Sequence, residues 1–175
     1  MNVDTGYVYK ESEWRFMEGI FPLLRYFKEH DFLLLLATNQ SGIARGYYRI
    51  EDFIRLSNFM QNALQKELGF MLDGIYFCPH APSDSCMCRK PRSGMIRQGI
   101  EDFGIDPAHS FIIGDKMSDI EAGSGANIAH RVLFESGGAQ EECFALESRP
   151  NKPTFIVNSL ISLINFLEKS GYLKE

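Results

Sequence analysis

Residues 78–91 read Cys78-Pro79-His80-Ala81-Pro82-Ser83-Asp84-Ser85-Cys86-Met87-Cys88-Arg89-Lys90-Pro91, and this stretch holds three of the four cysteines in the chain. Its candidate metal ligands follow the spacing Cys-x-His, five residues, then Cys-x-Cys. Three thiolates and one imidazole complete the tetrahedral shell that structural zinc prefers, and they leave no position open for a reacting water. We therefore predict a structural Zn²⁺ whose ligands are Cys78, His80, Cys86 and Cys88.

The alternative interpretation of this stretch is a pair of disulfides or scattered buried thiols. Cys86 and Cys88 are too close in sequence for an easy mutual bridge, and nothing in the chain suggests the oxidising compartment that disulfides need. Arg89 and Lys90 follow the last ligand directly. A loop held by a metal and ending in two cations indicates a device that presents positive charge to an anion such as phosphate, although Lys90 by itself could be a solvated surface lysine.

Length and charge exclude several classes of protein. We expect a single domain over residues 1–175, with the zinc loop at residues 78–91, because this length can bury a substantial core. The net charge of −5 and the absence of lysine or arginine runs argue against non-specific nucleic-acid binding. No apolar stretch is long enough for a membrane span. We expect a cytoplasmic protein, because thiols in a metal cluster suit a reducing compartment. We also expect a monomer.

Apolar residues alternate between helical spacing and short continuous runs along the chain. The helical spacing predicts helices at Gly19–Glu29, Glu51–Leu68, Ser93–Phe103, Ser118–Gly125 and Leu160–Lys169, with Ser93 and Ser159 as N-caps. The apolar runs predict strands at Phe32–Ala37, Asp73–Cys78, Ser110–Ile113, Arg131–Phe134 and Thr154–Val157. The Ser136–Pro153 segment is expected to be loop and broken helix. This alternation predicts an α/β fold with a three-layer, Rossmann-like parallel sheet.

Polar residues follow three of the predicted strands. Thr38-Asn39-Gln40-Ser41-Gly42 follows the first, Arg89-Lys90 ends the zinc loop after the second, and Gly114-Asp115-Lys116 with Asp119 follows the third. Ligands of parallel sheets bind at the carboxyl ends of the strands, so we expect these residues to converge. A hydroxyl and an ammonium group can bind phosphoryl oxygens, and a carboxylate can bind Mg²⁺.

Each of these polar groups also has an ordinary structural interpretation. Thr38 and Asn39 could form a simple turn, and the two aspartates could be a helix N-cap and a first-turn acid. Phosphoryl transfer by a covalent route also needs an attacking group, and none is evident. No histidine stands beside a serine at the carboxyl end of a predicted strand, and Asp115 is better placed to bind a metal than to attack.

The chain resembles the haloacid-dehalogenase-like phosphatases over residues from Asn2 to about Ala126. The matching stretches are Asn2-Val3-Asp4-Thr5-Gly6-Tyr7-Val8, Thr38-Asn39-Gln40-Ser41-Gly42-Ile43-Ala44-Arg45-Gly46, Asp73-Gly74-Ile75-Tyr76-Phe77-Cys78-Pro79-His80, Cys86-Met87-Cys88-Arg89-Lys90-Pro91 and Gly114-Asp115-Lys116-x-x-Asp119. The metal loop joined to Arg-Lys-Pro is highly specific, whereas the Gly-Asp element alone would be weak evidence. The resemblance is closest to the members that remove the C7 phosphate of a heptose 1,7-bisphosphate during synthesis of the lipopolysaccharide core. The alternative within the family is a histidinol-phosphate phosphatase, whose relatives carry a similar zinc loop.

The resemblance implies a role for each matching residue. Thr38 and Lys90 stabilise the transferring phosphoryl group, Asp115 binds the catalytic Mg²⁺, and Asp119 supports it from nearby. The substrate implied is a small sugar bisphosphate, contacted by Asp4, Thr5, Gly6, Tyr7, Thr38, Asn39, Gln40, Ser41, Arg89, Lys90 and Lys116.

One departure from the family pattern is large. The family carries an Asp-x-Asp-Gly element at the end of a central first strand, where the first aspartate is the nucleophile and the second is the general acid/base. The 175 residues contain no such element. We therefore expect the chain as written to be inactive and the start site to have been assigned too late, with Met1 internal to the true product. The alternative is a non-catalytic module that binds sugar phosphates.

Overall fold

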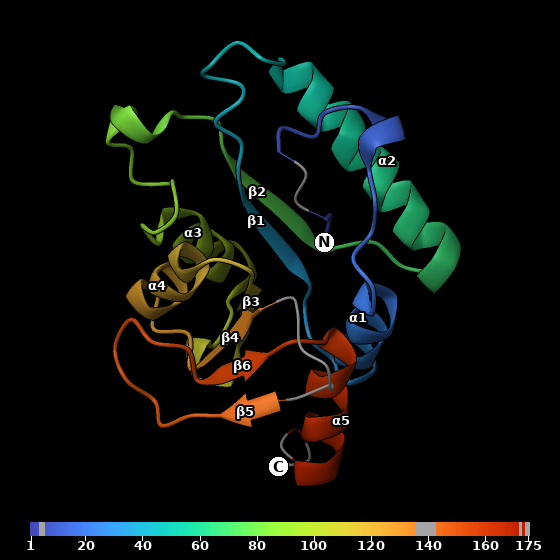
Figure 1. The fold of residues 1–175 in the computed structure, drawn as a ribbon, viewed down its shortest axis with the longest axis vertical. Helices are drawn as coiled ribbons and strands as arrows, with labels where there is room; N and C mark the ends of the chain where they lie inside the picture. The colour runs from blue at the N-terminus through green and yellow to red at the C-terminus, as the bar shows by residue number, and fades with distance from the viewer. Residues whose placement is uncertain (4–5, 136–142, 172, 174–175) are drawn as a thin grey trace. The chain divides into compact units, whose positions relative to one another are not determined.

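The computed structural model describes residues 1–3, 6–135, 143–171 and 173. Its elements form two compact units, Met1–Cys86 and Met87–Glu175. Both units have the predicted alternation of helices with mainly parallel strands (Figure 1). No described helix combines the length and the apolarity needed to cross a membrane.

The first unit is built on two parallel strands and two helices. Its elements are α1 (Ile20–Glu29), β1 (Leu35–Asn39), α2 (Ile50–Leu68) and β2 (Gly74–Cys78), with short 3-10 turns at Glu11–Glu13 and Pro82–Asp84. In the β1–β2 register, Leu35 lies opposite Gly74 and Asn39 lies opposite Cys78. The helix α2 packs against β2 through the rings of Phe53 and Phe77, whose centroids are 4.6 Å apart.

The first strand lies later in the chain than the apolar run predicts. We expected Phe32–Ala37 to be a strand buried on both faces, but β1 spans Leu35–Asn39 and is only partly buried. The residues before it serve other contacts: the Phe32 ring packs edge-on against Phe27 at 5.1 Å. Pairing with β2 sets the strand, and β2 is the only strand neighbour of β1 among the described residues. Thr38 and Asn39 are therefore the last residues of the strand and do not belong to the loop that follows.

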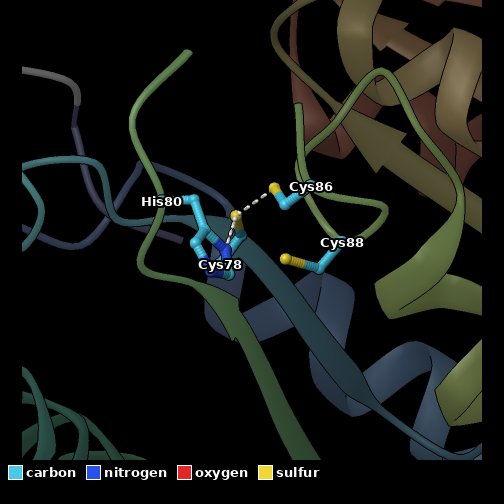
Figure 2. Close-up of side chains that lie close together, drawn as sticks. All are labelled: Cys78, His80, Cys86 and Cys88. Atoms are coloured by element: carbon cyan, nitrogen blue, oxygen red, sulfur yellow. Dashed lines mark hydrogen bonds between the residues drawn. The ribbon is translucent and has the colours of Figure 1, made fainter. Parts of the chain in front are cut away.

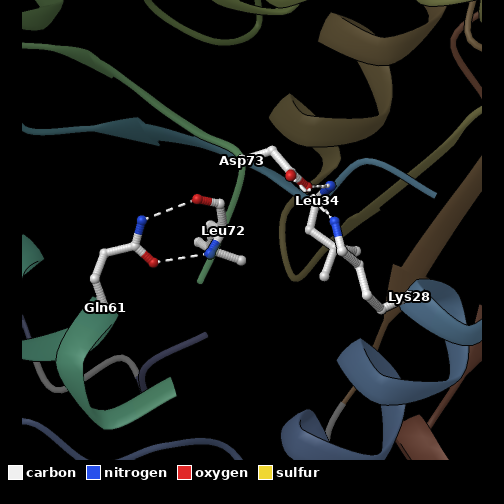
Figure 3. Close-up of polar contacts among 5 residues, drawn as sticks. All are labelled: Lys28, Leu34, Gln61, Leu72 and Asp73. Atoms are coloured by element: carbon white, nitrogen blue, oxygen red, sulfur yellow. Dashed lines mark hydrogen bonds and ion pairs between the residues drawn. The ribbon is translucent and has the colours of Figure 1, made fainter. Parts of the chain in front are cut away.

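Side-chain contacts from both helices hold the chain where it enters β2 (Figure 3). The Asp73 carboxylate accepts from Lys28 Nζ at 3.0 and 3.1 Å and from the Leu34 backbone N–H at 2.7 Å. The Gln61 side chain donates to the Leu72 carbonyl at 3.0 Å and accepts from the Leu72 N–H at 2.9 Å. Because both contacts immediately precede β2, they fix where that strand starts and hence where it delivers Cys78.

The second unit contains a four-stranded sheet with helices around it. Its elements are α3 (Gly94–Phe103), β3 (Phe111–Gly114), α4 (Met117–Gly125), β4 (His130–Phe134), β5 (Cys143–Ala145), β6 (Phe155–Val157) and α5 (Leu160–Ser170), with a 3-10 turn at Pro107–His109. The strand order is β3-β4-β6-β5. The first three strands are parallel. Its largest fully buried side chains are Ile120, Val132, Val157, Leu163 and Leu167.

Two expectations in this unit need correction. The strand β5 lies within the Ser136–Pro153 segment that we expected to be loop and broken helix, and it pairs antiparallel with β6; residues 136–142 lie outside the described part. The strand β5 has only three residues, and its Phe144 is exposed, so the sequence shows no alternation of apolar and polar residues there. Only its pairing with β6 identifies this segment as a strand.

Ser93 occupies the N-cap position of α3, but its hydroxyl accepts from Arg97 Nε at 2.9 Å and caps no backbone N–H. The Ser159 cap is confirmed, since its hydroxyl accepts from the Ile161 N–H at 3.1 Å.

Candidate active site and metal centre

The four predicted zinc ligands come together in a single loop of eleven consecutive residues (Figure 2). Their ligand atoms all lie within 4.8 Å of one another, and the residues are Cys78, His80, Cys86 and Cys88. The Cys78 sulfur is 3.5 Å from His80 Nδ1 and 3.5 Å from the Cys86 sulfur. A tetrahedral zinc with Zn–S bonds of about 2.3 Å places two thiolates about 3.8 Å apart. The spacing therefore fits Zn²⁺, and the disulfide alternative is wrong, because none of the four cysteines is bridged.

Backbone hydrogen bonds tie the first ligand to the turn that follows β1. Cys78 is the last residue of β2 and is fully buried. Its carbonyl accepts from the Gln40 N–H at 2.7 Å, and the Pro79 carbonyl accepts from the Ala44 N–H at 3.2 Å. A metal at Cys78 would thus steady the same backbone that carries Thr38.

The turn after β1 positions the predicted phosphoryl-binding hydroxyl. The Thr38 oxygen accepts from Gln40 Nε2 at 3.0 Å. The turn is closed by bonds such as Ile43 N–H to the Gln40 carbonyl, at 3.1 Å. Gly42 is required where the turn meets the Tyr48 ring, because a Cβ there would lie 2.2 Å from a ring carbon. Thr38 and Asn39 are therefore strand residues at the base of a closely packed turn.

The remaining substrate residues expected in this unit are placed only in part. Asp4 and Thr5 lie outside the described residues. Gly6 adopts a positive φ of 103°. The exposed Tyr7 ring stands edge-on to Tyr47 at 4.8 Å.

In the second unit, a buried ion pair holds the predicted phosphate-binding lysine. Lys90 Nζ lies 2.6 Å from Asp119 Oδ1, and the two side chains are 14% and 8% exposed. The other Asp119 oxygen accepts from the Lys116 N–H at 3.1 Å, as a first-turn acid does at the start of a helix. Lys90 is therefore not a solvated surface lysine, and both oxygens of Asp119 are engaged.

The Gly114-Asp115 element places a carboxylate at the end of β3. Gly114 has to be glycine, because a Cβ there would lie 2.2 Å from the Asp119 side chain. Asp115 is exposed. Within the described part of the chain, no hydrogen bond or ion pair engages its carboxylate. An exposed carboxylate oxygen is a ligand that Mg²⁺ accepts, so Asp115 fits the predicted role.

The structure thus brings the predicted residues together in three groups: the four zinc ligands, Thr38 with Gln40, and Lys90 with Asp119 and Lys116. Arg89 lies between the last zinc ligand and Lys90 and is partly buried. Convergence of the two units on one substrate stays a prediction. Sequence reasoning missed Tyr48, whose hydroxyl donates to Gln40, because neither tyrosine of Gly46-Tyr47-Tyr48 belongs to a recognisable motif.

Comparison of the sequence with known proteins identifies the family of this chain. A family model described as "HAD-hyrolase-like" matches residues 87–163. The chain is 38% identical over 173 residues to the D-glycero-beta-D-manno-heptose-1,7-bisphosphate 7-phosphatase of Haemophilus ducreyi, covering 95% of this chain and 92% of the relative. It is 49% identical over 134 residues to the enzyme of the same name from Helicobacter pylori, covering 77% of this chain and 78% of that one.

A solved structure agrees with the sequence relatives. The D,D-heptose 1,7-bisphosphate phosphatase of B. bronchiseptica, solved with magnesium and phosphate, matches with a TM-score of 0.77 and 26% identity, covering 97% of this chain and 93% of that one. The fold therefore agrees with that of this phosphatase over nearly the whole chain. The chain belongs to the haloacid-dehalogenase-like hydrolases and, within them, to the D-glycero-D-manno-heptose 1,7-bisphosphate 7-phosphatase family.

Proposed function

We propose that this protein serves in the hydrolysis of the C7 phosphate of D-glycero-D-manno-heptose 1,7-bisphosphate, on the route to the lipopolysaccharide core. The observation that carries the proposal is the metal loop running directly into Arg89-Lys90, with Lys90 buried against Asp119. A buried ammonium group presented by a rigid loop is suited to a phosphoryl oxygen. The names of the relatives supply the heptose substrate.

The roles of the residues follow from their chemistry. Thr38 donates its O–H to a phosphoryl oxygen, and Lys90 neutralises charge on the same group. Asp115 would hold Mg²⁺, which when bound neutralises charge on the phosphoryl group during transfer. Asp119 acts through Lys90, because its carboxylate orients the ammonium group. Asn39, Ser41, Arg89 and Lys116 are proposed to contact the sugar bisphosphate.

The missing nucleophile sets the form of the test. We propose that the 175 residues alone do not hydrolyse phosphate esters, because they contain no Asp-x-Asp-Gly element. A nucleophile-bearing chimera would join before Met1 a strand and turn of about 15–20 residues ending in that element. Release of phosphate by this chimera from heptose 1,7-bisphosphate, and not from histidinol phosphate, supports the proposal. Preference for histidinol phosphate would support the alternative enzyme.

A binding module is the second candidate, and the absence of Asp-x-Asp-Gly from the 175 residues favours it. In that case the chain should bind a sugar bisphosphate with an affinity that the chimera does not improve. Isothermal titration of both proteins with heptose 1,7-bisphosphate separates the two functions. We further propose that the protein acts in the cytoplasm, since four cysteines without a disulfide suit a reducing compartment. A monomer is proposed as its oligomeric state.

Replacing Lys90 should affect turnover and stability by separate routes. In the chimera, we expect Lys90→Ala to lower kcat by about 10²–10³-fold, as removal of an oxyanion-binding donor typically does. It should also lower the melting temperature, because Asp119 is left buried without its cation. The Lys90→Ala/Asp119→Asn double variant should regain much of the melting temperature but not the turnover.

The exposed Lys152 offers a matched control for this experiment. We expect Lys152→Ala to leave both the turnover and the melting temperature unchanged. Recovery of turnover in the Lys90→Ala/Asp119→Asn double variant would remove Lys90 from phosphoryl binding.

Asp115→Asn tests the Mg²⁺ assignment. The substitution keeps the size of the side chain but removes one charge from a site for a hard cation. In the chimera we expect loss of Mg²⁺-dependent hydrolysis with little change in the melting temperature, because Asp115 is exposed. A variant that retains both its activity and its Mg²⁺ requirement would contradict the assignment.

A further inference from the structure

Gln40 lies between two hydroxyl groups in the turn after β1. The Tyr48 hydroxyl donates to Gln40 Oε1 at 2.5 Å, and Gln40 Nε2 donates to the Thr38 oxygen at 3.0 Å. Tyr48 is buried, with 6% of the residue exposed, and its hydrogen bond to Gln40 is partly buried. The amide of Gln40 is thus engaged at both ends by the protein, although the family resemblance assigns this residue to the substrate.

The direction of these two hydrogen bonds decides whether the Thr38 hydroxyl is a donor or an acceptor toward the protein. Burial and the nearby Tyr7 raise the pKa of Tyr48, which keeps its phenol protonated and hence a donor at neutral pH. A donor at Tyr48 requires the carbonyl end of the amide to face it, so the N–H end faces Thr38. The Thr38 oxygen then receives a hydrogen bond, and its own O–H donates to none of the residues that the structure describes.

We propose that Tyr48 is a positioning residue which, through Gln40, keeps the O–H of Thr38 pointed away from the protein as a donor to a phosphoryl oxygen. The inference rests on the proposed function in one respect: the oxyanion that receives the proton is a phosphate. The relay itself is a property of the free protein, so it can be tested separately.

The surroundings of Tyr48 allow its hydroxyl to be removed without disturbing its ring. The ring stacks on Tyr9 with centroids 5.5 Å apart and an interplanar angle of 10°. It also lies against Gly42, where even a Cβ would not fit. These contacts use ring carbons only, so Tyr48→Phe keeps them and deletes the one bond to Gln40. The freed amide can then rotate, presenting its oxygen to Thr38 and capturing the O–H.

The first test is made on the free 175-residue protein by NMR. Tyr48→Phe should move the side-chain amide resonances of Gln40 and the methyl resonance of Thr38. Tyr47→Phe is the matched control, because Tyr47 is 53% exposed and its ring contacts Tyr7. Unmoved Gln40 amide resonances in Tyr48→Phe would overturn the relay, whatever the protein binds.

The second test measures binding of inorganic phosphate in the presence of Mg²⁺. We expect Tyr48→Phe to raise Kd by about three- to tenfold, the range for one lost hydrogen bond. In a Thr38→Val background, Tyr48→Phe should have no further effect, which is the signature of a residue that acts through Thr38. Equal effects in both backgrounds would overturn the inference. If the unmodified chain binds no phosphate, the inference that Thr38 donates to a phosphoryl oxygen is wrong, and the proposed function loses support. The NMR result still decides whether Tyr48 acts on Thr38 through Gln40.

Discussion

Loss of the metal from the Cys78–Cys88 loop is expected to disorder that loop and to lower the melting temperature sharply. Structural zinc contributes apparent binding energies of about 10–16 kcal/mol in small peptides, which is far more than one loop needs to fold. The loop has little else to hold it, since Cys78 is the only buried residue from 78 to 88 and the local order comes from a short 3-10 turn at Pro82–Asp84. Protein purified without added metal should contain about one zinc per chain, because four protein ligands complete the shell.

Two cysteine variants make this expectation specific. Cys86→Ser removes one ligand of the cluster and should release zinc and lower the melting temperature before any chemical step is affected. Cys143→Ser is the matched control, because Cys143 lies in β5 and outside the cluster, and burial raises the pKa of its thiol. It should retain zinc. A zinc-free protein of unchanged stability would show that the cluster is not a metal site.

Acid should reverse metal binding in the same way. Thiolates and a neutral imidazole are the forms that bind zinc, so protons compete with the metal for all four ligands. Lowering the pH should therefore release zinc in one cooperative step, together with loss of loop order. A chelator added at neutral pH should produce the same end state.

The parts of the site that lie close together in sequence were predictable. The zinc ligands lie within eleven residues, so their spacing alone limits them to one cluster. The Ser159 cap was predictable for the same reason, because its partner is the Ile161 N–H. Strand limits were less predictable: the apolar run Phe32–Ala37 identifies a strand, but the register against β2 decides where β1 begins.

Contacts between residues far apart in sequence could not be predicted. The sequence around Lys90 does not predict that its ammonium group pairs with Asp119, because the pair depends on how α4 packs after β3. The buried Arg131 is a similar case. Its guanidinium donates to the carbonyls of Ile128 and Lys152, at 2.6 and 2.9 Å. A charged residue at the start of a strand gives no sign in sequence that backbone carbonyls will surround it.

The second large effect expected concerns hydrolysis itself. The 175-residue polypeptide should release no measurable phosphate from heptose 1,7-bisphosphate, whereas the nucleophile-bearing chimera should turn over. Uncatalysed hydrolysis of phosphate monoesters is so slow that enzymes accelerate it by up to about 10²¹-fold. Thr38, Lys90 and one carboxylate at Asp115 supply binding and charge neutralisation, but they offer no atom that attacks phosphorus.

The sheet topology predicts that the chimera and the 175-residue form also differ in stability. The strand β1 belongs to a two-stranded sheet, and β3 is an end strand of the four-stranded sheet. End strands are the places where a further strand can be added by backbone hydrogen bonds. We therefore expect the chimera to melt at a higher temperature than the 175-residue form and to be less prone to aggregate. Gel filtration and thermal melting of the two proteins, at equal concentration and with zinc present, measure this directly.

A third protein separates the chemical contribution of the added strand from its structural one. In this variant of the chimera, the first aspartate of the added Asp-x-Asp-Gly element is replaced by asparagine. It should match the chimera in melting temperature and in phosphate binding but release no phosphate, because only the attacking carboxylate is lost. Phosphate release by the unmodified 175-residue form would refute the assignment of the nucleophile. A stable 175-residue form that binds the heptose bisphosphate, beside a chimera that binds equally and hydrolyses nothing, would instead establish the binding module.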